Sequence, residues 1–110
     1  MADVQSMQSV LDGLISRLHP GLGGDALGEI LNRLVWLTDD NGADVIAVCR
    51  GWLKSGDRRR VEAALSIEEG WLYEGRDDLR TNLLEVGSQW PHLMTRVEEI
   101  LCLHDSQFGR

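Results

Sequence analysis

The sequence is poor in the features that mark disulfide-stapled, membrane-spanning or β-rich proteins. It contains two cysteines and two prolines in 110 residues, and its aromatic share is 5%. Two cysteines in a chain long enough for its own core do not form a disulfide framework, so we expect Cys49 and Cys102 to be reduced. The longest apolar run, Val45 to Cys49, is far shorter than the roughly 18 residues of a transmembrane helix. We therefore expect no membrane span.

The chain also lacks the opening of a secreted protein. It begins Met1-Ala2-Asp3-Val4-Gln5, with neither a basic segment nor a long apolar one behind it. A secretory signal requires both. Together with the expected reduced cysteines, this predicts a cytoplasmic protein.

Basic residues are scarce as well. There are 11 of them against 18 acidic residues, giving a formal net charge of −7. This charge repels nucleic acid and acidic lipid and attracts cationic proteins. The exception is the run Arg58-Arg59-Arg60, which is either a solvated helix face or, with Arg76 and Arg80, a basic binding patch.

Apolar residues recur at three- and four-residue steps along nearly the whole chain, which predicts amphipathic helices. No stretch alternates cleanly enough for a strand. The predicted helices and their apolar stripes cover residues 3–18, 25–34, 45–53, 58–72, 77–90 and 91–101. We expect an all-α fold of about six helices in one domain, residues 1–110, with a frayed polar tail at 105–110.

The four tryptophans mark a repeat. Trp36, Trp52 and Trp71 each begin the same short pattern: two bulky residues that end a predicted helix, a polar or glycine-containing turn, and an apolar residue that starts the next helix. Trp90 begins a variant of this pattern before the last helix. One helix and one turn per pattern predict three stacked antiparallel hairpins, as in a HEAT-like α-solenoid or a compact helical bundle. Trp52 and Trp71 are then expected in the core, although tryptophan also anchors interfaces.

No constellation for catalysis or ligand binding is present. The three histidines lie far apart, and no paired cysteine or histidine spacing matches a metal site. The glycines at 21, 23 and 24 lack the lysine of a phosphate-binding loop. We expect no catalytic residue, no cofactor and no metal, and hence no enzyme.

Acidic residues concentrate in the turns between the predicted helices. In a hairpin stack, alternate turns lie at one end, which would bring two acidic turns together into a ridge facing a cationic partner. The same acids can instead be helix caps and first-turn residues. The candidate partner-binding residues are Asp39, Asp40, Asp44, Glu74, Asp77 and Asp78, with Tyr73 as an amphipathic anchor.

One segment resembles a known family. Gly51-Trp52-Leu53-Lys54-Ser55-Gly56-Asp57, the stretch Ala64 to Leu72, and Gly87 with Trp90-Pro91-His92-Leu93 are similar to HEAT-like immunity proteins encoded beside bacterial polymorphic toxins. The similarity covers residues 51–91 and consists mostly of the turns of a helical repeat. The resemblance implies a cytosolic inhibitor that blocks one cognate toxin by occlusion. It therefore assigns no catalytic residue to this sequence.

Three hypotheses remain at this point. The first is an immunity protein that binds a basic, nuclease-like toxin domain, with no nucleic acid, membrane or cofactor involved. The second is an acidic helical adaptor or secretion chaperone that holds an extended segment of another protein. The third is an enzyme or nucleic-acid binder that uses the basic island Arg58-Arg59-Arg60 together with Arg76 and Arg80. The oligomeric state is not predicted by the sequence.

Overall fold

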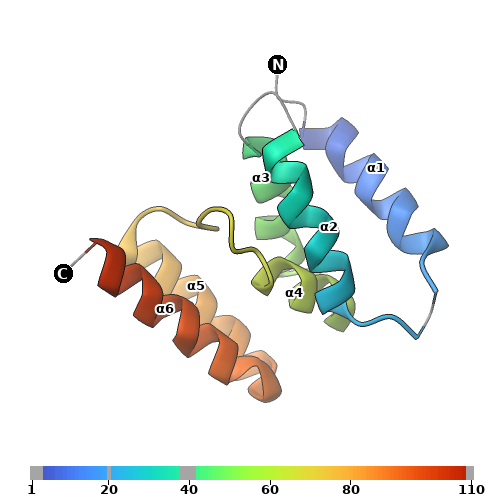
Figure 1. Ribbon diagram of the computed structural model, residues 1–110. Helices are drawn as coiled ribbons and strands as arrows, with labels where there is room; N and C mark the ends of the chain where they lie inside the picture. Colours follow the sequence, from blue (N-terminus) through green and yellow to red (C-terminus); the bar gives the residue numbers. More distant parts are fainter. Residues whose placement is uncertain (1–3, 20, 38–41, 109–110) are drawn as a thin grey trace. The chain divides into compact units, whose positions relative to one another are not determined.

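The computed structural model describes residues 4–19, 21–37 and 42–108, and all regular elements among these residues are helices, with no strand. The predicted all-α class with about six helices is confirmed. The elements are α1 (Val4–Arg17), α2 (Gly24–Leu37), α3 (Ala43–Trp52), α4 (Arg58–Leu65), α5 (Arg76–Gln89), the short 3-10 helix η1 (Pro91–Leu93) and α6 (Met94–Phe108) (Figure 1). In the part of the chain that the structure describes, none of these helices has the length and apolarity to cross a membrane.

The chain divides into two compact units, Met1–Leu72 with α1 to α4 and Tyr73–Arg110 with α5, η1 and α6. The organisation of residues 1–110 as one domain stays a prediction.

In the first unit, α2 packs most extensively against α4, and α1 packs chiefly against α3. Two glycines on one face of α2 allow the close approach to α4, because a Cβ at Gly24 or Gly28 would lie 2.3 Å from the Cβ of Glu62 or Ser66. The core of this unit consists of apolar side chains from all four helices: Leu11, Leu27, Leu31, Val45, Val48, Cys49, Trp52, Val61, Ala64 and Leu65. Burial raises the pKa of the Cys49 thiol to about 12, so this free cysteine is a neutral core residue.

The basic island holds α1 and the loop after it to α4. The Arg60 guanidinium donates to Asp12 on α1 at 3.1 Å and to Asp57, before α4, at 2.6 Å. Burial lowers the pKa of Arg60, but the hydrogen bonds to the two carboxylates outweigh this effect and raise it. Arg59 donates to the carbonyl of His19, and Arg58 pairs with Glu62. The three arginines are therefore engaged within this unit.

The fourth helix is shorter than the sequence predicts. The prediction of a helix continuing to Leu72 is wrong, because α4 ends at Leu65 and residues 66–75 are irregular. The hydroxyl of Ser66 donates to the carbonyl of Glu62, and the backbone beyond it is hydrogen-bonded by Asn32 of α2. Tertiary hydrogen bonds thus replace the helical ones. Trp71 then lies half-buried in the irregular segment.

The second unit is a helical hairpin in which α5 and α6 lie side by side (Figure 1). Its buried apolar residues are Leu79, Leu83, Val86, Val97 and Ile100. The helix α6 continues to Phe108, so the first part of the predicted polar tail is helical. Near that end, His104 is buried, its Nε2 lies 3.0 Å from the carbonyl oxygen of Glu74, and Arg76 pairs with Asp105.

Candidate functional site

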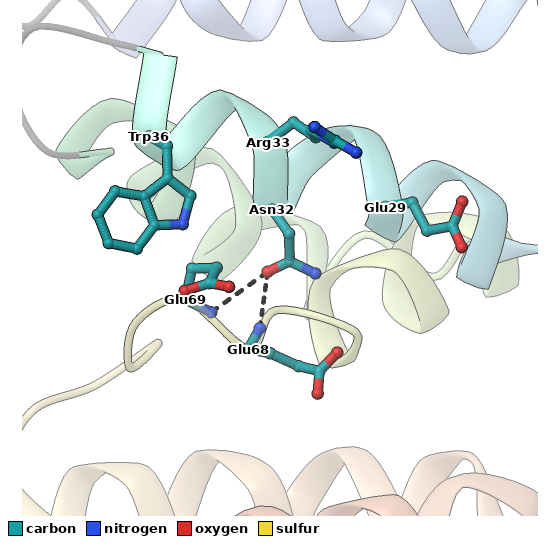
Figure 2. Close-up of a pocket in the computed structure, with 6 residues that line it drawn as sticks. All are labelled: Glu29, Asn32, Arg33, Trp36, Glu68 and Glu69. Atoms are coloured by element: carbon teal, nitrogen blue, oxygen red, sulfur yellow. Dashed lines mark hydrogen bonds between the residues drawn. The ribbon is translucent and has the colours of Figure 1, made fainter.

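A pocket of about 510 Å³ lies on the first unit, between α2 and the segment that follows α4. Four of its lining residues come from α2 and two from the irregular segment (Figure 2). They are Glu29, Asn32, Arg33, Trp36, Glu68 and Glu69. The volume lies within the range of roughly 300–1,000 Å³ that is typical of ligand sites in proteins.

The helical period of α2 explains which side chains reach the pocket. Leu27, Leu31 and Val35 recur at four-residue steps and are buried on the face that packs into the core. Residues 29, 32, 33 and 36 recur at three- and four-residue steps on another face, so they line one surface together. The helix that supplies the core therefore also supplies one wall of the pocket.

Asn32 fixes the other wall. Its Nδ2 donates to the carbonyl of Ser66 at 2.9 Å, while its Oδ1 accepts from the backbone N–H groups of Glu68 at 2.7 Å and Glu69 at 3.2 Å. The dashed lines in Figure 2 mark the last two bonds. One amide side chain thus uses donor and acceptor together and holds both acidic residues at α2 by their backbone.

Trp36 is the most unusual residue of the site. Tryptophan is highly buried on average, and Trp52 follows this rule with 2% of its surface exposed. Trp36 is 73% exposed, and the next residue, Leu37, is 77% exposed. The last turn of α2 therefore presents two large apolar side chains to solvent. The prediction that Trp52 is a core residue is confirmed.

The polar groups around Trp36 are mostly acidic. Among the described lining residues, the three carboxylates of Glu29, Glu68 and Glu69 stand against one guanidinium, that of Arg33. Among the described residues these four charged groups form no ion pair, in contrast to the engaged arginines of α4. In Figure 2 the Glu69 side chain lies between Trp36 and Asn32, whereas the Arg33 side chain extends away from Trp36.

Of the predicted partner-binding residues of the first unit, the structure describes only Asp44, which does not line this pocket. Asp39 and Asp40 lie outside the described residues. Asp44 is only 8% exposed, and its carboxylate accepts from the N–H of Val45 at 2.8 Å in the first turn of α3. A large part of its surface is therefore enclosed by the fold.

The other predicted residues belong to the second unit. Asp77 and Asp78 are exposed in the first turn of α5, where carboxylates interact favourably with the helix dipole. Glu74 is also exposed, and Tyr73 is half-buried. Because the candidates are divided between two units, the acidic ridge that would join them stays a prediction.

The sequence analysis singles out Trp36 as a residue of the tryptophan repeat, but it does not place Trp36 beside Glu68 and Glu69. These two glutamates fall inside the predicted helix of residues 58–72, whereas α4 ends at Leu65. The available signal was the second periodic face of α2, where Glu29, Asn32, Arg33 and Trp36 follow helical spacing. The hydrogen bonds of Asn32 to a segment more than thirty positions away carry no local signal.

The remaining chemistry of the described residues is sparse. No group of three or more histidine, cysteine, aspartate or glutamate side chains among them could hold a metal ion. In comparisons with protein-family models, curated proteins and solved structures, none matches the chain.

Proposed function

We propose that this protein is an interaction protein that binds and occludes a cationic protein domain, as cytoplasmic immunity proteins do with bacterial toxins. The observation that supports this best is the end of α2. There, exposed Trp36 and Leu37 adjoin a pocket with the carboxylates of Glu29, Glu68 and Glu69. Exposed aromatic anchors beside charge of one sign are features of protein-binding surfaces.

The apolar and acidic parts have separate physical roles in this proposal. Burial of Trp36 and Leu37 against the partner would supply most of the affinity, because a few large anchors carry most of the binding energy of an interface. The net charge of −7 would accelerate encounter with a cationic domain. The earlier candidates Asp39, Asp40, Asp44, Tyr73, Glu74, Asp77 and Asp78 contribute to this field or to the rim, and no catalytic or cofactor-binding role is proposed.

The proposal predicts that a neighbouring gene encodes a protein ending in a folded, cationic, toxin-like domain, and the test titrates that domain with the full chain. Calorimetric titration should give a tight complex. A double substitution, Trp36→Ser with Leu37→Ser, should weaken it by about 2 kcal/mol or more, or roughly 30-fold, mainly through faster dissociation. Val10→Ser is the matched control, because Val10 is an apolar residue of α1 with 63% of its surface exposed.

Three results would contradict the proposal. One is the absence of a complex with the folded domain. A second is equal weakening by Val10→Ser and by the double substitution. The third is equal binding of an unfolded segment of the same domain, which is the behaviour of a chaperone that holds extended chains. Circular dichroism of each variant establishes that its helices are intact.

A further inference from the structure

We infer that the pocket between α2 and residues 68–69 binds the guanidinium group of an arginine side chain on the cationic partner. The inference rests on the proposed function and names the chemistry that the partner presents at this point. The pocket combines an exposed indole, three carboxylates without ion pairs among the described residues, and a backbone held by Asn32.

The indole selects a flat cation. Tryptophan is the best aromatic partner for cation–π contacts, and arginine forms them more often than lysine does. A guanidinium also stacks on aromatic faces, whereas an ammonium is a strongly hydrated point charge. Most of the Trp36 surface is exposed, so its ring is accessible to such a group.

The carboxylates select charge and orientation. A carboxylate can accept two parallel hydrogen bonds from one guanidinium. Glu69 lies between the indole and Asn32 in Figure 2, so its carboxylate is placed to meet a guanidinium stacked on Trp36. Because Asn32 holds the N–H of Glu69, the backbone that carries this carboxylate is fixed before binding.

Arg33 and the pocket carboxylates should affect the binding affinity of a cation in opposite directions. Among the described residues that line the pocket, Arg33 is the one cationic side chain, and its charge opposes the entry of another cation. Removing that charge should therefore strengthen binding, whereas removing a pocket carboxylate should weaken it. A role of these residues in folding alone does not predict opposite signs.

The probe is the end-blocked tripeptide Gly-Arg-Gly at millimolar concentration, followed by NMR on the full chain. It should shift the indole N–H signal of Trp36 saturably. The same peptide with neutral citrulline in place of arginine should not, and Gly-Lys-Gly should bind more weakly. Glu69→Gln should lower the affinity for the arginine peptide about three-fold, as expected for the loss of one exposed charge contact. Arg33→Gln should raise it.

Asp25→Asn is the matched control, because Asp25 is an exposed carboxylate of α2 outside the pocket lining. The inference is wrong if the arginine peptide does not shift the Trp36 indole N–H signal saturably, or if the citrulline peptide shifts it equally. It is also wrong if Glu69→Gln and Asp25→Asn change the affinity for the arginine peptide equally. The proposed function fails separately, when the wild-type chain does not bind the folded cationic domain. If that domain binds but the peptide result is negative, the pocket assignment alone is wrong.

Discussion

Single residues decide how closely α2 and α4 approach. At Gly28, an added Cβ would lie 2.3 Å from the Cβ of Ser66 and 2.9 Å from its hydroxyl oxygen. Gly24, one turn earlier, would bring a Cβ within 2.7 Å of the Arg59 carbonyl oxygen. Backbone and Cβ atoms cannot rotate away as the end of a long side chain can. These two glycines are therefore required by the packing, which also sets the wall of the pocket.

Gly28→Ala should consequently destabilise the protein. Overpacking of a core contact costs about 1–3 kcal/mol, and the higher helix propensity of alanine offsets up to about 1 kcal/mol of that. We expect a net loss of about 1–2 kcal/mol in the free energy of unfolding, measured by urea titration. Gly13→Ala is the control, since nothing lies within 4 Å of a Cβ there and α1 should gain about 0.5–1 kcal/mol. Equal effects of the two substitutions would contradict this packing.

At the scale of elements, α1 has the fewest buried residues of the four helices in the first unit, and it carries an ion pair to α4. Leu11 is its only fully buried residue, whereas α3 buries six residues. The ion pair of Asp12 with Arg60 adds a specific link from α1 to α4. Arg60 also lies over the ring of Trp52, with Cζ 5.8 Å from the ring centroid. One side chain thus connects two helices and the core tryptophan.

A double-mutant cycle of Asp12→Asn and Arg60→Met should measure that link. Both side chains are partly exposed, so we expect a coupling energy of about 0.5–1 kcal/mol, reduced at high salt. The control cycle uses Arg96 and Glu99, an i,i+3 pair within α6, for which about 0.3 kcal/mol is typical. Coupling no larger than in the control would mean that α1 is held by apolar packing alone.

The elements also show where sequence reasoning succeeds. The α2 stripe of Leu27 and Leu31 is buried as predicted, because periodic apolar spacing directly reports burial on a helix. The end of α4 was missed, because Val61 to Leu72 keeps helical spacing while Asn32 hydrogen-bonds the backbone of Glu68 from another helix. The same contact assembles the pocket. Its two walls were visible as separate patterns, but their juxtaposition depends on tertiary contacts.

For the whole molecule, the division into two units has a consequence for stability. Chains below about 40 residues rarely fold alone without further support, and Tyr73–Arg110 is close to that size. The first unit contributes four helices to its own core, including buried Trp52, whereas the hairpin has only α5, η1 and α6. Local opening is expected where fewer buried apolar contacts resist it.

Native-state hydrogen exchange should therefore separate the units. We expect the slowest amides of α5 and α6 to exchange at least about ten-fold faster than the slowest amides of α3, because a smaller core opens at a lower free energy. The measurement is exchange followed by NMR at neutral pH on the full chain. Equal protection in α3 and α6 would be the behaviour of one cooperative domain over residues 1–110.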